Sequence, residues 1–277
     1  MNARVILVAL ASVALVGCAD EATPSSEVTV DFGFAVNGAP FECGAEYDGV
    51  GEPAVPFKAT DARFYLHDLQ LLHASAGWQS LELDAGAFQG QGLALLDFEN
   101  GCGPDGTAET HTTLTGRIAA PDQDFVAVRF TLGVPKAQNF LDLARSAAPL
   151  DVTGMYWTWQ SGYKFLKVDG SSPASGGGLN PYLLHVGASG CPGENPQAPP
   201  VGDCVSANLA RIELLDFSPG SKIVADLGTL LATVDLSFNT EGTAPGCMSE
   251  AGDPECLTLL PRLGIDDADA QQLFAIE

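Results

Sequence analysis

The feature that most constrains the fold is a period-two alternation of apolar residues in short segments. It is clearest in VTVDFGFAV, Val28 to Val36, and in FVAVRFTL, Phe125 to Leu132. Residues two apart on a strand share a face, so both segments predict half-buried strands. Further strands are predicted at Ala62 to Leu72, Leu93 to Phe98, Thr112 to Ile118, Met155 to Gln160, Phe165 to Val168, Tyr182 to Val186 and Leu209 to Phe217.

Helical periodicity is scarce, and turn-forming residues are abundant. The chain has 31 Gly and 18 Pro, and helices are expected only at Lys136 to Ala144, Leu227 to Ala232 and Asp266 to Ala275. Gly170 to Gly178 and Gly193 to Asp203 are rich in Gly, Ser or Pro and predict surface loops. We therefore expect an all-β fold, an antiparallel β-sandwich or open barrel with long loops and a few short helices.

The N-terminus predicts export. Arg4 precedes an apolar run that ends just before Cys18, which is typical of a secretory signal and too short for a membrane-spanning helix. Leu15 to Cys18 resembles a bacterial lipobox, which implies cleavage before Cys18 and a lipid on its sulfur; the alternative is an ordinary signal peptide with a free cysteine. We expect a signal peptide at 1–17, a lipidated tether at 18–27 and one β domain at 28–277, anchored by lipid to a bacterial membrane in the periplasm or at the cell surface.

Six cysteines remain after Cys18, and an even number in an exported chain indicates disulfides. Six cysteines allow 15 pairings, so spacing alone does not fix the connectivity. Proximity in sequence favours Cys191–Cys204 and Cys247–Cys256, each closing a loop rich in Pro and Gly, which leaves Cys43–Cys102. No two of these cysteines form a C-x-x-C pair, which argues against a zinc site or a redox dithiol.

Charge and motifs exclude several classes of function. With 12 Lys and Arg against 35 Asp and Glu, the net charge is -23. Phosphate would be repelled, so we expect no nucleic-acid binding and a preference for cations or a basic partner surface. The chain has no G-x-S-x-G elbow, P-loop, dinucleotide fingerprint or EF-hand loop. The sequence therefore gives no specific support for these enzyme and calcium-binding classes, and it indicates no organic cofactor.

The stretch GMYWTWQSGYKFLKVDG holds Trp157 and Trp159, two residues apart. On a regular strand the two indoles would share one face with Met155. Such a pair most often packs in a core, because indoles bury large areas. If exposed, the rings suit a platform for stacking sugars, or a redox role in which one indole passes an electron hole to a partner.

A metal site is the other chemistry to consider. Neutral imidazole is the commonest metal ligand type, and His67, His111 and His185 are candidates. The thioether of Met155 beside imidazoles would favour Cu(I) over zinc or calcium. Asp97, Glu99 and Asp105 could instead bind calcium, although their loop matches no calcium motif.

Several segments together resemble the MbnP-like proteins, a family with a four-cysteine motif. They include the W-x-W-Q-x-G-Y-K-F block and the cysteine placement, and they cover most of the mature chain in the family's order. The quoted segments are DARFYLHDLQLL, LALLDFENGCG, FTLGVP, APLDVTGMYWTWQSGYKFLKVD, LHVGASGC, GCMSEAGDPEC and LGI.

The resemblance implies a β-rich periplasmic or surface protein that binds copper. It also implies a partner similar to MauG-like di-haem cytochrome c peroxidases, which oxidises Trp157 or Trp159 to kynurenine. In that case this chain is the substrate of the partner and is not an enzyme. His67 and His185 match family positions, while His111 stands where Asn is more usual. Phe140 stands where the family has a histidine, so the resemblance supports tryptophan oxidation better than it supports the copper ligands.

Overall fold

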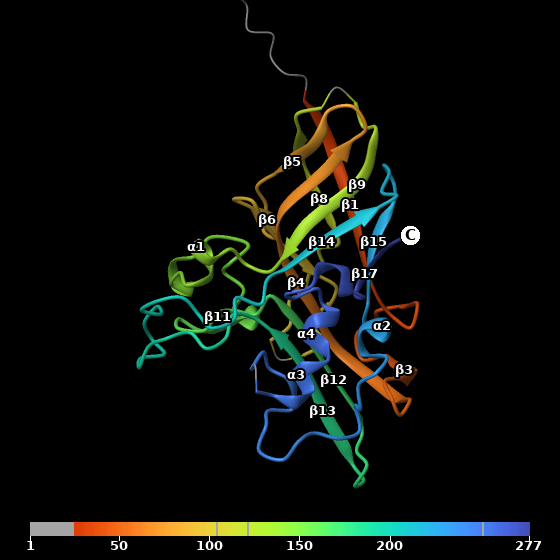
Figure 1. Ribbon diagram of the computed structural model, residues 1–277, viewed down its shortest axis with the longest axis vertical. Coiled ribbons are helices and arrows are strands. Elements are labelled where there is room, and N and C mark those ends of the chain that lie inside the picture. The colour runs from red at the N-terminus through yellow and green to blue at the C-terminus, as the bar shows by residue number, and fades with distance from the viewer. Residues whose placement is uncertain (1–24, 104, 121, 251) are drawn as a thin grey trace, which may run out of the picture.

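The computed structural model describes residues 25–277, apart from 104, 121 and 251. The signal peptide, Cys18 and most of the tether lie outside the described residues. Mostly β structure is found, in one long, curled, open sheet resembling a half-barrel (Figure 1), which confirms the open-barrel form of the predicted fold. The main strands are β1 (Ser26–Val36), β4 (Val55–His73), β5 (Gly77–Leu83), β7 (Leu93–Asp97), β8 (Thr113–Ile118), β9 (Phe125–Leu132), β12 (Leu166–Pro173), β13 (Leu179–Val186), β14 (Ala210–Leu215) and β15 (Lys222–Asp226).

Shorter elements complete the sheet and its connections. The short strands are β2 (Ala39–Pro40), β3 (Glu46–Val50), β6 (Gln89–Gly90), β10 (Tyr156–Thr158), β11 (Gly162–Tyr163), β16 (Gly246–Cys247) and β17 (Phe274–Ile276). The helices are α1 (Lys136–Asn139), α2 (Leu227–Leu231), α3 (Pro254–Leu257) and α4 (Leu259–Arg262), with 3-10 turns η1 (Leu143–Arg145), η2 (Thr153–Met155) and η3 (Ala268–Ala270). No helix in the described part of the chain is long and apolar enough to cross a membrane.

β4 is the spine of the sheet. Along its 19 residues it pairs with β3, β12, β7, β9 and β5. Most strand pairs are antiparallel, as predicted, but β1 with β15 and β13 with β16 are parallel. The sheet therefore depends on contacts between segments far apart in the sequence.

The two faces of the sheet carry different side chains. Phe64 and Leu66 of β4 point into the main core, which also takes apolar residues from β1, β9, β12, β13 and α2. Tyr65 belongs to a second, smaller cluster on the other face, with Met155, Tyr163 and Phe165. The β10–β11 hairpin and the loops around α1 supply much of this second layer, which lies to one side of the sheet (Figure 1).

A bulge in β4 changes which residues share a face. On a regular strand we would expect His67 to share a face with Tyr65 and Leu69, but Leu69 packs in the main core and Tyr65 in the second cluster. Asp68 has a positive φ of 54°, and the pairing of β4 with β9 shifts between His67 and Gln70. One extra residue at a bulge reverses the alternation beyond it, which is why this expectation is wrong.

Other local expectations also need correction. The predicted C-terminal helix is wrong: only the turn η3 forms there, because Asp266 has a left-handed φ of 65° and Phe274 enters the core on β17. The predicted helix from Lys136 ends at Asn139. Gly170 to Pro173 belongs to β12 rather than to a loop, and Ser172 there is buried.

All three predicted disulfides are confirmed. They join Cys43 to Cys102, Cys191 to Cys204 and Cys247 to Cys256. Disulfides of this kind are typical of exported proteins, because the compartments that receive such proteins are oxidising and disulfides persist there.

Candidate functional site

Trp157 lies at the centre of the short β10 strand, and a set of contacts holds its hairpin in place. The side chain of buried Asn139 accepts a 2.9 Å hydrogen bond from the backbone N–H of Tyr163. The ammonium of Lys164 donates to the carbonyl of Gly154 at 2.8 Å. Burial lowers the pKa of Lys164 to about 8, an effect that nearby Lys167 reinforces. The turn before Trp157 and the strand after it are thus fixed from two sides.

The Trp157 ring rests against the end of β13. A Cβ atom placed on Gly187 would lie only 2.5 Å from Cζ3 of the Trp157 ring, so this close approach requires glycine. The ring centroid of Trp157 is 6.5 Å from that of His185, and the two planes are tilted by 50°. The side chain of Trp157 is half-buried, so part of it is packed and part of it is exposed to solvent.

A cleft of about 710 Å³ opens beside Trp157. It lies between the β10–β11 hairpin and the segments that follow β13 and precede α3. Its walls include Trp157, Gln160, Ser189, Met248, Glu250 and Asp253. The cleft therefore combines an indole, a thioether and acidic side chains, although polar groups dominate its lining.

Trp159 is placed differently from Trp157. The expected strand from Met155 to Gln160 is shorter than predicted, because Met155 closes the turn η2 and β10 ends at Thr158. The indole N–H of Trp159 donates a 2.7 Å hydrogen bond to the backbone carbonyl of Phe140. The two indoles thus make separate contacts, Trp157 with β13 and the cleft, and Trp159 with the end of α1.

His185 is the histidine that lies beside Trp157. It is buried, its Nε2 is 2.5 Å from a carboxylate oxygen of Asp169, and its Nδ1 has no hydrogen-bond partner among the described residues. His185 and Lys167 lower the pKa of the Asp169 carboxyl, although burial opposes them. A carboxylate on one nitrogen fixes the ring and leaves the other nitrogen directed away from it.

The other predicted ligands are dispersed. Nδ1 of His67 is 2.8 Å from the carbonyl oxygen of Gly133, and burial lowers its pKa. His111 stacks on Phe88 with ring centroids 5.1 Å apart, and burial lowers its pKa also. Met155 is fully buried in the second cluster, among apolar and tyrosine side chains.

Register shows how far apart two of the histidines lie. His185 pairs with Lys167, Lys167 with Arg63, Arg63 with Asp97, and Asp97 with His111. Four strand spacings of about 4.8 Å separate the ends of this row by about 19 Å along the sheet. The structure therefore does not bring His111 and His185 to one ion.

The same row carries a buried ionic network. Lys167 pairs with Asp61 at 2.6 Å and with Asp169 at 3.2 Å, while Arg63 also pairs with Asp61. Arg63 is wholly buried, and its Nη1 is 3.8 Å from Glu99. The network links the Asp169–His185 pair to the loop that follows β7.

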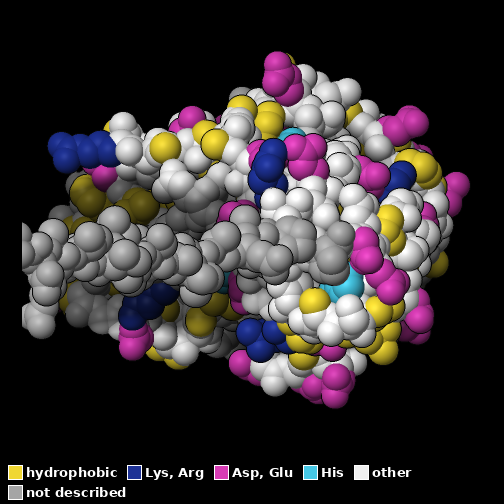
Figure 2. Space-filling view, turned by 90° about the horizontal axis from the view of Figure 1, so that it is seen from above, with side chains coloured by type: hydrophobic (Ala, Val, Ile, Leu, Met, Phe, Trp, Pro, Cys, Tyr) yellow, Lys and Arg dark blue, Asp and Glu magenta, His cyan; other side chains and the backbone are white. Residues whose placement is uncertain are grey.

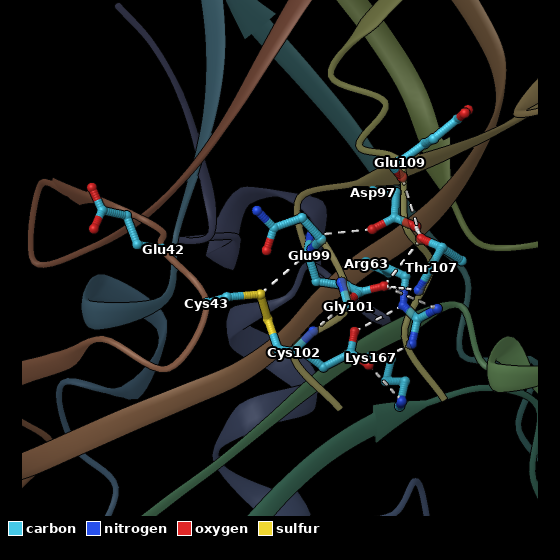
Figure 3. The surroundings of a disulfide bond; sticks show 12 residues. Glu42, Cys43, Arg63, Asp97, Glu99, Gly101, Cys102, Thr107, Glu109 and Lys167 are labelled. Atoms are coloured by element: carbon cyan, nitrogen blue, oxygen red, sulfur yellow. Dashed lines mark hydrogen bonds and ion pairs between the residues drawn. A yellow bond between two sulfur atoms is a disulfide. The ribbon is translucent and has the colours of Figure 1, made fainter. Parts of the chain in front are cut away.

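That loop is organised around the Cys43–Cys102 disulfide (Figure 3). Ligand atoms of Cys43, Glu99 and Cys102 lie within 4.8 Å of one another, a spacing that could hold a metal. Both sulfurs are joined in the disulfide, and the carboxylate of Glu99 accepts hydrogen bonds from the N–H groups of Gly101, Cys102 and Thr107. These hydrogen bonds lower the pKa of Glu99, although burial opposes them. Because the two sulfurs and the carboxylate are already bonded, these three residues hold the loop in place in the folded protein.

Sequence reasoning missed Met248 as a candidate. Met248 follows Cys247 of β16, which pairs in parallel with Leu184 beside His185. It is the methionine that lines the Trp157 cleft, whereas Met155 is enclosed. Its position after a cysteine in a Gly- and Pro-rich segment gave no periodic signal that could have identified it.

Comparisons with known proteins agree with this architecture. A family model described as MbnP matches residues 25–249. A solved structure, MbnP from Methylosinus trichosporium, is similar with a TM-score of 0.77 and 25% identity, covering 91% of this chain and 98% of that chain. No curated protein sequence matches. The family match includes the β10–β11 hairpin, His185 and Met248.

Proposed function

Because the chain belongs to the MbnP family, we propose that it is an exported copper-binding protein whose Trp157 is oxidised to kynurenine by a partner. The partner is a di-haem cytochrome c peroxidase of the MauG-like kind. In this proposal the protein is a substrate of that partner and not itself an enzyme. Its role is in copper homeostasis.

The observation that carries the proposal is the position of Trp157 on the wall of a cleft, beside His185. A partner that oxidises an indole must come close to the ring, and the open cleft exposes the Trp157 ring to such a partner. Trp159 has its N–H bonded to Phe140 and serves better as a relay for the electron hole. Trp157 is therefore the favoured site of modification.

The residues near Trp157 also suit a soft metal ion. Among the described residues Nδ1 of His185 has no hydrogen-bond partner, while Asp169 orients the ring, which is how metal-binding histidines are commonly held. Met248 adds a thioether on the wall of the cleft beside Trp157, and imidazole with thioether favours Cu(I). The aryl amine of a kynurenine at position 157 would add a further donor. His67, His111 and Met155 are ligands predicted from the sequence, but they do not line this cleft and are not part of the proposed site.

The chemistry balances with peroxide as oxidant. Two peroxide molecules each accept two electrons and each leave one oxygen atom on the indole, cleaving its pyrrole ring to N-formylkynurenine and releasing two waters. Hydrolysis then removes the formyl group as formate and leaves the aryl amine. The haem of the partner supplies the oxidising power, and this chain positions the indole.

Mass spectrometry of the peptide that contains both tryptophans tests the modification. The protein is produced with its partner and peroxide, and the expected product has lost one carbon and gained one oxygen at Trp157. Trp157→Phe should abolish the change, and the matched variant Trp159→Phe should slow it while leaving Trp157 modified. An unaltered peptide in the presence of an active partner would refute the oxidation.

Copper titration with a competing Cu(I) chelator tests the metal site. Met248→Leu should weaken binding about tenfold or more, whereas Met155→Leu, a swap of the same type in the core, should not. His185→Ala should weaken binding, and His73→Gln serves as control because His73 is occupied by Asp122 and nearby backbone N–H groups. This cleft would be excluded as the copper site if Met248→Leu bound Cu(I) as tightly as Met155→Leu, and His185→Ala as tightly as His73→Gln.

A sugar- or surface-binding role for Trp157 and Trp159 is the alternative from the sequence. A stacking platform needs two exposed rings, but both indoles are half-buried and they make separate contacts. Binding of glycans that is lost in Trp157→Ala would favour the alternative.

The proposed location is the periplasm or cell surface, with a lipid anchor on Cys18. The three disulfides support export, and the lipobox-like residues before Cys18 support the anchor. Labelling with radioactive palmitate, compared with Cys18→Ser, tests the anchor directly.

A further inference from the structure

A loop with exposed apolar side chains lies beside the Trp157 cleft. This 191–205 loop is closed by the disulfide between Cys191 and Cys204. Val201 in the loop is 85% exposed and Val205 is 83% exposed, although valine is usually a core residue. A single exposed apolar side chain is ordinary, but apolar side chains gathered on one surface mark an interaction site.

The 191–205 loop is held firmly against the rest of the protein. Gln160, in the turn between β10 and β11, donates its side-chain amide to the carbonyls of Cys191 at 3.1 Å and Gly193 at 2.6 Å. Within the loop, the backbone N–H of Val201 donates to the carbonyl of Pro192 at 2.9 Å. A surface fixed in this way loses little conformational freedom when a partner binds.

An apolar hollow adjoins the loop on the side of α1. Its volume is about 140 Å³, and its apolar walls include Val134, Phe140, Phe165 and Leu209. Cys204 lines this hollow, Cys191 lines the Trp157 cleft, and Ala188 lines both, so the two openings share a wall. Protein interfaces are commonly anchored by one apolar side chain that fills such a hollow.

The rim of this surface carries acidic side chains. Residues 187–210 and 238–253, which supply the loop and part of the cleft wall, contain no Lys or Arg. Glu194 on the loop and Glu250 on the cleft wall are both exposed. Lys136 of α1 also reaches the loop, but it pairs there with Asp203. An apolar centre within a charged rim is the usual anatomy of an interface, and this rim calls for Lys or Arg on the partner.

We propose that the 191–205 loop and the adjoining hollow are the docking surface for the di-haem peroxidase, which meets them with a basic face around an apolar side chain. This inference rests on the proposed function. A second copy of this chain is disfavoured as the occupant, because both copies would carry a net charge of -23 and the same acidic rim.

The location suits an oxidising partner. The hollow reaches Phe140, whose carbonyl accepts the hydrogen bond from the indole N–H of Trp159. The cleft on the other side of the shared wall is lined by Trp157. A partner docked over the disulfide therefore lies close to both indoles, and small interfaces of this kind are typical of transient redox complexes.

Binding and kinetics, measured separately, test the docking surface. The probe is the MauG-like di-haem peroxidase of the same organism; its Kd is measured without peroxide, and oxidation of Trp157 is followed with peroxide. The double variant Val201→Ser, Val205→Ser should raise the Kd and the KM about tenfold and leave kcat nearly unchanged. Leu215→Ser, at a 66% exposed position on the far end of β14, should behave as wild type. Thermal unfolding checks that each variant is folded.

Charge reversal tests the acidic rim. Glu194→Lys should lower kcat/KM severalfold at low salt and make it less sensitive to NaCl, because it removes an attraction that salt screens. Glu213→Lys makes the same change at an exposed position on β14 and should have a smaller effect.

The outcomes separate docking from oxidation. If the double valine variant binds the peroxidase as tightly as wild type and Trp157 is still oxidised, the docking surface is overturned and the proposed oxidation stands. If binding depends on the two valines but no oxidation follows, the docking surface stands and the oxidation is refuted. If the peroxidase neither binds nor oxidises wild type, both are refuted. Dimers of wild type alone that disappear in the double variant would assign this surface to a second copy instead.

Discussion

Gly187 determines how Trp157 sits against β13. A side chain there would meet the indole at 2.5 Å and the carbonyl oxygen of Tyr163 at 2.6 Å. Neither neighbour is the free end of a flexible chain, because the ring is packed and the carbonyl is backbone. The position of the proposed oxidation site therefore depends on a residue that takes part in no chemistry.

The first prediction concerns this position. Gly187→Ala should destabilise the protein by about 1–3 kcal/mol, the usual cost of overpacking, and should shift the tryptophan emission as the indole moves. Gly176→Ala is the control, because a Cβ there meets nothing within 4 Å. Urea unfolding measures both, and equal stability of the two variants would contradict the packing described.

Asp97 is the second residue with a measurable consequence. Burial raises its pKa to about 6, above the value near 4 expected for the unfolded chain. The folded state then holds its proton more tightly, so this residue's contribution to stability falls as the pH rises from about 4 to about 6.

The matching prediction compares Asp97→Asn with wild type. The variant removes this titration, so its stability relative to wild type should increase by about 1–2 kcal/mol between pH 4 and pH 7. Taking the difference cancels the other groups, including His67 and His111, whose lowered pKa acts with the opposite sign. Urea unfolding at several pH values measures it; a constant difference would show that Asp97 is ionised throughout.

At the scale of elements, β4 shows the effect of one irregular residue. Asp68 adopts a left-handed conformation, so the residues on its two sides alternate in opposite phase. Tyr65 can face the second cluster while Leu69 and Leu71 both face the main core. The bulge lets one strand serve both layers.

The third prediction follows from this conformation. Asp68→Val should cost about 1–2 kcal/mol, because a β-branched residue strongly resists a positive φ, whereas Asp68→Gly should be close to neutral. Lys58→Val, at an exposed regular position of the same strand, controls for the change in side chain. Thermal unfolding of the three variants checks the order, and an unaffected Asp68→Val would argue against the bulge.

The sequence predicted the elements whose patterns are regular. β1, β8, β9 and β14 appear close to their expected bounds. β8 and β14 alternate over their whole length, whereas Val126 of β9 is exposed and the last three residues of β1 are all buried. The disulfides were also predicted, because consecutive cysteines flank loops. The predicted helix at Asp266 to Ala275 failed because the pairing of β17 with β15 outweighs local preference.

The candidate site was predicted in part. Trp157 and His185 were identified and lie together. Met155 was preferred to Met248 on the premise of a regular strand, which the turn η2 interrupts. Met248 reaches the cleft through the parallel pairing of β16 with β13, a contact between distant segments that local pattern cannot reveal.

For the whole molecule, charge is the dominant property. Acidic side chains are spread over the face shown in Figure 2, with fewer Lys and Arg among them. Self-repulsion of a net charge of -23 opposes compactness, and salt screens it over about 10 Å at 0.1 M.

The fourth prediction is that NaCl stabilises the protein at neutral pH. Raising NaCl from low concentration to about 0.5 M should increase the Tm by several degrees, with most of the gain at low salt, where screening changes fastest. Repeating the series near pH 4, where many carboxyls are protonated, should remove most of the gain. A gain that persists unchanged at pH 4 would point to salting-out rather than to charge.

The order of the disulfides bears on how the chain would mature in the proposed export. Each bridge joins a cysteine to the next one along the chain, 43 to 102, 191 to 204 and 247 to 256, and no bridge encloses or crosses another. A chain that emerges from the membrane N-terminus first meets its cysteines in this same order. An oxidant that couples each new thiol to the preceding free one would produce the native set without later reshuffling. The connectivity thus suits a cell envelope equipped with a thiol oxidase alone, where a crossed pattern would also require an isomerase.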